Sequence, residues 1–191
     1  MMIQPWLDRS EHEARIAALL AAVSSETLSA VRYEVSQGGT WPEGHRADGA
    51  HEVDLSVELV MASGASLALS WAMDGLNEGL AIELKEAGRL GSGLTPEAVD
   101  VGDRVEWANF LGGSIVKIAP AWHVPNEGCP EMPWAFRLDF SDSSCLVIAL
   151  GESKGSGFTY MPDSLVIIFD ESTAAAYKIP ASFTSSLARS E

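Results

Sequence analysis

The chain carries one sequence pattern twice. Residues 57–71 align without a gap onto residues 136–150, and each stretch places large apolar residues at alternating positions around a short polar turn. This alternation is typical of a half-buried antiparallel strand, so each stretch predicts a β-hairpin with one apolar face. A third apolar segment follows each hairpin, with these residues: Leu80, Ile82 and Leu84 in the first copy, and Leu165, Ile167 and Phe169 in the second.

The two copies predict a β-rich α+β protein of two pseudo-repeated antiparallel meanders. Their apolar faces would cover each other, as a sandwich or as a partly closed barrel. The repeats cover about 28–94 and about 105–180 of a single domain over residues 1–191. A strand ending at Val35 precedes the first meander, and the segment 114–118 is expected to play the same role before the second.

Outside the repeats, the pattern predicts an N-terminal amphipathic helix over residues 10–24, lying over an open sheet edge. Ser10 and Glu13 have the spacing of a capping box, and apolar residues follow at helical intervals. The segments 36–50 and 120–134 are rich in turn-forming residues and predict long loops. Short helices are expected to begin near residue 95 and within 101–111.

The charge of the chain excludes several classes of partner. The formal net charge is −15, and a surface this negative repels nucleic acid backbones and anionic lipid. No apolar run approaches the roughly 20 residues of a membrane-spanning helix, and the start lacks a secretion signal. With Cys129 and Cys145 expected as free thiols, we predict a cytoplasmic protein that binds neither nucleic acid nor membrane.

A broad anionic surface is the main functional candidate. The alternating pattern puts Glu52, Asp54 and Glu58 on the polar face of one predicted strand, and Glu83, Asp100, Asp103 and Glu106 follow in later segments. Such a surface attracts a basic protein, and Trp41 and Trp122 in the two long loops are candidate anchors. The alternative is a solvated sheet face with both tryptophans folded back onto the core.

Motifs of common enzymes and cofactor sites are absent from the sequence, so we expect no cofactor and no metal. Two weaker constellations remain. His45, Asp48, His51 and Glu52 are candidate ligands of a divalent metal. His123 and Cys129, which share a loop with Glu127 and Glu131, are a candidate base and nucleophile. For each of them a structural role is the alternative.

The last part of the chain resembles a group of small bacterial proteins. The residues that carry the resemblance are Trp107, Leu111, Gly112 and Ile115, then Phe136 to Phe140 with its hairpin, and then the segment 160–169. Some proteins of this kind are similar to immunity proteins of polymorphic-toxin systems. The resemblance implies a non-catalytic protein that binds and neutralises a basic toxin, and it carries over no binding residue. Within this segment, Tyr160, Pro162 and Asp163 predict a structural corner.

The favoured function is therefore a stoichiometric, immunity-type inhibitor of a basic protein. The main alternative is a small-molecule-binding barrel, whose apolar ligand would lie among Trp71, Trp107 and Trp134 between the two meanders. An enzyme that uses the histidines and cysteine of the loops is the third reading.

Overall fold

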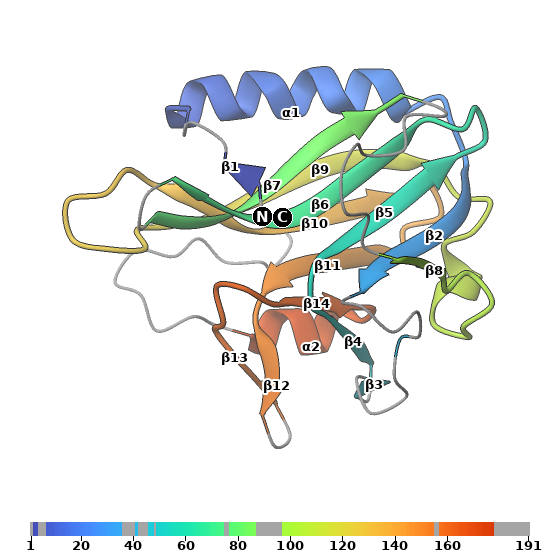
Figure 1. The fold of residues 1–191 in the computed structure, drawn as a ribbon. Coiled ribbons are helices and arrows are strands. Elements are labelled where there is room, and N and C mark those ends of the chain that lie inside the picture. Colours follow the sequence, from blue (N-terminus) through green and yellow to red (C-terminus); the bar gives the residue numbers. More distant parts are fainter. Residues whose placement is uncertain are drawn as a thin grey trace.

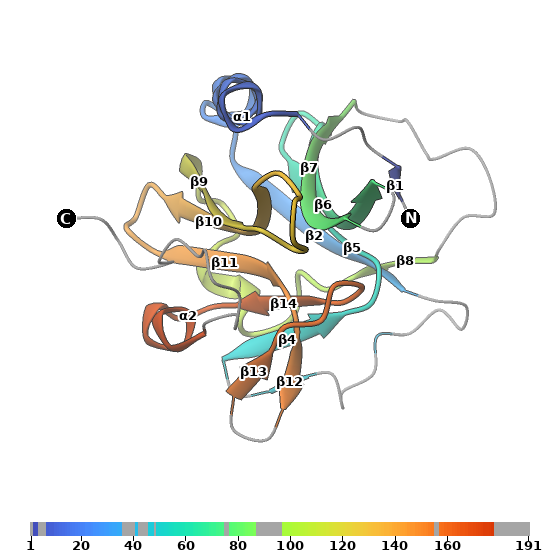
Figure 2. The same cartoon turned by 90° about the vertical axis from the view of Figure 1, so that its left-hand side faces the viewer.

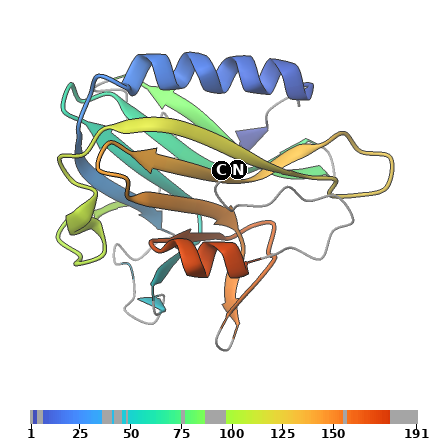
Figure 3. The same cartoon turned by 180° about the vertical axis from the view of Figure 1, so that it is seen from behind.

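The computed structural model describes residues 2–3, 7–35, 41, 46–47, 49–74, 77–86, 97–154 and 157–177. Two six-stranded sheets, called sheet A and sheet B, face each other across one core, and a two-stranded sheet lies below them (Figure 1). Helix α1 (Arg9–Val23) covers one side of the sandwich, and the short helix α2 (Glu171–Ala176) packs against sheet B at the other (Figure 3).

Sheet A contains the first meander. Its strand order is β7–β6–β5–β2–β8, and β1 pairs in parallel with the end of β6. The bounds are β1 (Met2–Ile3), β2 (Leu28–Val35), β5 (Ser56–Met61), β6 (Ser66–Asp74), β7 (Asn77–Lys85) and β8 (Glu97–Asp100).

Sheet B contains the second meander, in the order β3–β4–β14–β11–β10–β9. Its strands are β3 (Arg46–Ala47), β4 (Ala50–Val53), β9 (Ile115–His123), β10 (Met132–Phe140), β11 (Cys145–Leu150) and β14 (Leu165–Ile168). The small third sheet pairs β12 (Glu152–Lys154) with β13 (Gly157–Thr159). No described strand of sheet A pairs with one of sheet B, so the two sheets form a sandwich and not a closed barrel.

The hairpins of the two meanders have identical register. Glu58 lies opposite Ala68 in the first, and the equivalent residues Arg137 and Val147 lie opposite each other in the second. The turns match as well, because Gly64 and Ser143 both adopt positive φ, 87° and 72°. In each turn the residue that ends the first strand, Met61 or Phe140, donates its N–H to the carbonyl four residues later.

The flanking strands extend the match. Val31 of β2 lies opposite Leu59, as Ile118 of β9 lies opposite Leu138, and a register shift interrupts both pairings at the start of the outer strand. The fourth strands agree too, since β7 pairs with β6 as β14 pairs with β11. The two pseudo-repeated antiparallel meanders predicted from the sequence are thus confirmed strand by strand.

The inward-facing residues of both copies form one apolar core. The following of them are fully buried: Val57, Leu59, Leu67 and Leu69 from sheet A, and Leu138, Leu146, Ile148 and Ile167 from sheet B. Burying a side chain of this size stabilises the fold by roughly 1.5–3 kcal/mol. The two sheets therefore need each other, because either sheet alone would leave its apolar face in water.

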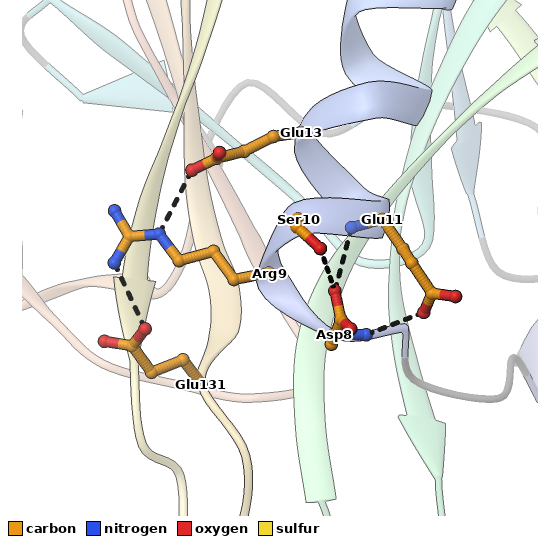
Figure 4. Close-up of polar contacts among 6 residues, drawn as sticks. All are labelled: Asp8, Arg9, Ser10, Glu11, Glu13 and Glu131. Carbon is orange, nitrogen blue, oxygen red and sulfur yellow. Dashed lines mark hydrogen bonds and ion pairs between the residues drawn. The ribbon is translucent and has the colours of Figure 1, made fainter.

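Helix α1 closes the side of the sandwich between strands β7 and β9 (Figure 2). It spans Arg9–Val23, close to the predicted range, but its cap is Asp8 and not Ser10. The Asp8 carboxylate accepts the N–H of Glu11, and the Glu11 carboxylate accepts the N–H of Asp8 (Figure 4). Arg9 joins the helix to the β9–β10 connection through Glu131, at 3.1 Å.

Several expectations about connecting segments are wrong. The expected continuous strand through Glu52 and Glu58 bends at residues 54–55, so β4 joins sheet B while β5 stays in sheet A. The expected loop 120–134 is shorter than predicted, because β9 and β10 extend into it until only residues 124–131 connect them. Residues 97–100 form β8 rather than a helix, and the helix expected within 101–111 is one turn, η2 (Trp107–Asn109).

Candidate functional site

The two copies differ in two connections. Between the first two strands of the meander, the first copy has residues 36–55, which include β3 and β4, where the second copy has residues 124–131. Before the last strand, the second copy has residues 151–164, which include β12 and β13, where in the first copy β7 begins at Asn77 soon after β6 ends at Asp74. These two additions contact each other, because the N–H of Ser153 donates to the Glu52 carboxylate. Figure 1 shows β4, β12 and β13 together below the sandwich.

A buried chain of polar side chains lies where β4 meets sheet A. Trp107 Nε1 donates to the Tyr33 hydroxyl at 2.9 Å, and that hydroxyl lies 2.7 Å from Nδ1 of His51. An indole N–H only donates, so the Tyr33 oxygen accepts it. The bond between the Tyr33 hydroxyl and Nδ1 takes its direction from the imidazole tautomer. All three side chains are completely buried.

The other end of this chain reaches a carboxylate near the surface. Nε2 of His51 lies 3.4 Å from Oε2 of Glu106, whose side chain is 13% exposed. Burial raises the pKa of Tyr33 well above its usual value, and the nearby Glu106 carboxylate raises it further, so Tyr33 stays protonated and able to donate. This series of polar side-chain contacts connects strand β2, strand β4 and the segment before η2.

Trp41 forms a lid on this unit. Its ring lies 4.5 Å from the His51 ring, and its Nε1 donates to the carbonyl of Glu52 at 2.7 Å. The guanidinium of Arg104 lies over the Trp41 ring, 5.7 Å from the ring centroid. The rings of Phe169 and His51 pack in a T-shaped arrangement, with 4.8 Å between their centroids. We call Tyr33, Trp41, His51, Glu106 and Trp107 the His51 cluster.

An exposed loop grows out of this cluster. Residues 100–106, the acidic loop, contain Asp100, Asp103 and Glu106, and they present Val105 with 68% of its surface exposed. Asp103 is 84% exposed. The loop is fixed at both ends, because the N–H of Val101 donates to Val31 in β2 and Trp107 is held by Tyr33. Within it, the N–H of Gly102 donates to the Asp100 carboxylate at 2.9 Å.

The structure separates the predicted anionic surface into parts. Trp41, Glu52 and Glu106 lie in or beside the His51 cluster, and Asp103 lies in the acidic loop. Asp54 lies in the bend between β4 and β5, where its carbonyl accepts Nε1 of Trp71. The remaining predicted residues, Glu58, Glu83 and Trp122, lie on other elements: β5, β7 and β9.

The outer face of sheet A is not purely acidic. Glu58 lies 3.7 Å from the Arg32 guanidinium and accepts the Ser66 hydroxyl at 2.6 Å. Glu83 lies on the same face, with Ala68 between it and Glu58. Pairing weakens both places as attractors, because Asp103 of the acidic loop also lies 3.7 Å from Nε of Arg104. The acidic loop differs from this face by its exposure, since the Asp103 side chain is 84% exposed and the Glu58 side chain 19%.

Both tryptophans proposed as anchors are buried. Trp41 is 4% exposed and Trp122 is 2% exposed. Trp122 lies beneath helix α1, with the Arg9 guanidinium 5.1 Å from its ring and the His12 ring at 5.6 Å. The alternative stated for them, lids on the core, is the correct one. Among the described residues three large apolar side chains are exposed, Leu84, Val105 and Val116, and Val105 is the most exposed of them. Sequence reasoning missed Val105, whose signal was an apolar residue isolated between charged neighbours.

The catalytic and metal readings gain little from the structure. His45 and Asp48 lie outside the described residues, and His51 uses Nδ1 for Tyr33. Within the described part of the chain, no group of three His, Cys, Asp or Glu residues is placed to hold a metal ion. His123 and Cys129 contact consecutive residues of β7, with Nε2 of His123 facing the Glu78 carbonyl and Cys129 donating to Asn77.

The three tryptophans expected around a small apolar ligand have different partners. Trp71 donates to the carbonyl of Asp54, Trp107 packs against Phe110 and Phe169, and Trp134 packs against Tyr177. They therefore do not form one wall. A small cavity lies elsewhere, between α1 and β7, and has room for about one water molecule.

Comparisons with known protein families, with curated proteins and with solved structures found no match to this chain. None of the described helices is long and apolar enough to cross a membrane. Functional assignment therefore depends on the residues of the His51 cluster and the acidic loop.

Proposed function

We propose that this protein is a non-catalytic, cytoplasmic binding protein that captures a basic protein partner through the acidic loop. Its role would be that of an immunity-type inhibitor, which occupies the cationic surface of a toxin and blocks it. The observation that carries this proposal is the placement of an exposed valine among exposed carboxylates on a loop whose base is rigidly held.

Charge supports the first step of binding. With a net charge of −15, the chain has a long-range field that accelerates encounter with a cationic partner and disfavours acidic ones. The Asp103 side chain is 84% exposed and that of Glu106 only 13%, so Asp103 would meet the partner first of the two. Arg104 offsets part of this charge, because its Nε lies 3.7 Å from the Asp103 carboxylate while its guanidinium lies over Trp41.

Rigidity supports the second step. A flexible loop loses conformational entropy when it binds, and this loss weakens the complex. Here Val101 bonds to β2, and Trp107 is buried and bonded to Tyr33, so the loop is fixed before it meets a partner. Val105 would then fill an apolar pocket on the partner, with Asp103 and Glu106 on its rim.

The test is capture of host proteins at low and high salt by four baits: wild type, Asp103→Asn, Val105→Ser and Glu83→Gln. We expect a basic protein that wild type retains at low salt, with weaker retention at high salt and with both loop variants. Glu83→Gln removes the same charge from the sheet face and should retain the partner. Coexpression must then suppress toxicity of that partner. Equal loss in all three variants, or retention that ignores the loop, contradicts the proposal.

A further inference from the structure

The imidazole of the His51 cluster has an oxygen atom near each of its two nitrogens. Nδ1 lies 2.7 Å from the Tyr33 hydroxyl, and Nε2 lies 3.4 Å from Oε2 of Glu106. A hydroxyl oxygen can accept two hydrogen bonds, so the Tyr33 oxygen can accept Nδ1–H in addition to the indole N–H of Trp107. A protonated imidazole carries a hydrogen on both nitrogens. The surroundings of His51 therefore suit its protonated form as well as its neutral form.

Glu106 connects His51 to the acidic loop. Nε2 of His51 and Oε2 of Glu106 are both buried, while 13% of the Glu106 side chain is exposed. Glu106 is the last residue of the acidic loop and directly follows the exposed Val105. Water screens the interaction between these two buried atoms only weakly, so a charge on His51 acts strongly on the Glu106 carboxylate. A proton bound by His51 therefore changes the electrostatics of the loop.

Two other titratable residues near His51 have different roles. Burial raises the pKa of Tyr33 well above its usual value, so its phenol stays neutral in the pH range in which histidines titrate. Glu52, the next residue of β4, accepts the N–H of Ser153. The carboxylate at ion-pair distance from His51 is that of Glu106.

Several neighbours of His51 oppose a positive charge on its ring. The guanidinium of Arg104 lies over the Trp41 ring, which packs against His51. In the strand pairings, Arg46 of β3 lies opposite His51 on one side and the apolar Ile167 of β14 on the other. Burial among apolar residues disfavours the charged form of histidine, whereas the Glu106 carboxylate favours it. These opposing effects make the protonation of His51 sensitive to pH.

We propose that His51 is a proton switch that regulates the acidic loop. In its protonated form, which takes up one proton from solvent, His51 pairs with Glu106 and cancels the charge of that carboxylate. In its neutral form, the Glu106 charge adds to that of Asp103 and attracts a cationic partner. Capture of the partner would then weaken in mild acid and would release a proton from His51. This effect on capture rests on the proposed function, whereas the switch is a property of the protein alone.

The experiment is an NMR titration of the isolated, full-length protein from pH ~8 to pH ~5, the range in which histidines titrate. It follows the ring nitrogens of His51 and the backbone amides of Val105 and Glu106. We expect the ring signals to change with one midpoint, and the two amides to follow that same midpoint. Ring signals that stay constant, or amides that do not follow the ring, overturn the proposal.

Variants separate the specific pair from the general field of an acidic protein. Glu106→Gln removes the counter-charge and should lower the midpoint of the His51 titration by about 1–3 pH units. Glu83→Gln removes the same charge from β7 and should move the midpoint by less than about 0.3 pH units. In His51→Gln the transition should disappear from the amides of the loop. Equal shifts in Glu106→Gln and Glu83→Gln overturn the proposal, and the wild-type titration decides it if Glu106→Gln does not fold.

Capture of the basic partner at pH ~7.5 and pH ~5.5 then tests the effect on binding. We expect wild type to retain less partner at the lower pH and His51→Gln to retain similar amounts at both. Wild-type capture that is equal at both pH values contradicts regulation by His51. A titrating His51 without any captured partner contradicts the proposed function and not the switch. A captured partner together with an unresponsive His51 contradicts the switch and not the proposed function.

Discussion

The first and second copies of the meander are alike in their strands and different in their connections. Strand pairings, the register shift and the turn conformation repeat from one copy to the other. The connections do not repeat, and each difference brings a buried polar cluster: His51 on β4 in the first copy, and Tyr160 after β13, with its ring 5.4 Å from that of His123, in the second. The repeated strands therefore build the shared core, and the unequal connections place the buried polar clusters.

The two copies also differ in how they protect one sheet edge. In sheet A the outer edge of β2 is covered by β8, with Tyr33 opposite Val99. The equivalent strand β9 is the last strand of sheet B, and Pro120 takes the position of Tyr33. Proline has no N–H to offer a further strand, which discourages pairing with other chains at an open edge. The outer edge of β9 in the second copy is thus protected by a proline, whereas the equivalent edge of β2 in the first copy is covered by a strand.

The largest expected effect tests whether the two copies contribute equally to the shared core. Leu59→Ala and Leu138→Ala remove the same side chain from matching, fully buried positions. Each should lower the free energy of unfolding by about 2–5 kcal/mol, because a cavity replaces packed atoms. Chemical denaturation followed by circular dichroism measures this. A large loss for one variant with little for the other would show that one copy alone supports the fold.

The next effect concerns acid stability and belongs to the second copy. Since burial lowers the folded-state pKa of His123 to about 4, the unfolded chain binds its proton first as the pH falls. Stability from this residue is complete above pH ~6.5 and is lost down to pH ~4, by about 3 kcal/mol in all.

The variant His123→Gln isolates this contribution from other acid-sensitive groups. The difference in unfolding free energy between pH 7 and pH 4 should be smaller in the variant by about 3 kcal/mol. Glu78, whose pKa burial raises, acts in the opposite direction and is present in both proteins. An unchanged difference would mean that His123 is accessible to protons in the folded state.

A smaller effect contrasts a tyrosine from each polar cluster. Tyr33→Phe removes the hydroxyl that accepts from Trp107 and shares a hydrogen bond with His51, and should cost about 1–3 kcal/mol. Tyr160→Phe removes a hydroxyl without a described partner and should change stability by less than about 0.5 kcal/mol. Thermal denaturation compares the pair directly. Similar losses in both would indicate that the Tyr160 hydroxyl has a structural partner.

The smallest effect exchanges the turn residues of the two hairpins. Ser143 has a positive φ of 72° where the first copy has Gly64 at 87°. Ser143→Gly should stabilise the protein by up to about 1 kcal/mol, and Gly64→Ser should destabilise it by a similar amount. Equilibrium unfolding resolves these values. The same sign for both exchanges would break the equivalence of the two turns.

The sequence predicted the repeated part of the fold well, since alternation of apolar residues determines which face of each strand is buried. It misplaced Glu52 because a two-residue period continues through the bend at residues 54–55, although the strand changes sheet there. Trp41 and Trp122 were proposed as surface anchors because tryptophan in a polar loop has no periodic signal of burial. The pairing of His51 with Tyr33 and Glu106 joins three distant segments, and no local pattern contains it.

The most direct test of the central claim is hydrogen exchange on the complex with the captured basic partner. If the acidic loop and the neighbouring connection with β4 bind the partner while the repeated strands carry stability, binding should slow exchange in residues 100–107 and in β4. The backbone amides of β5, β6 and β7 should exchange at the same rates as in the free protein. Protection that covers these three strands and leaves the acidic loop unchanged would contradict the account.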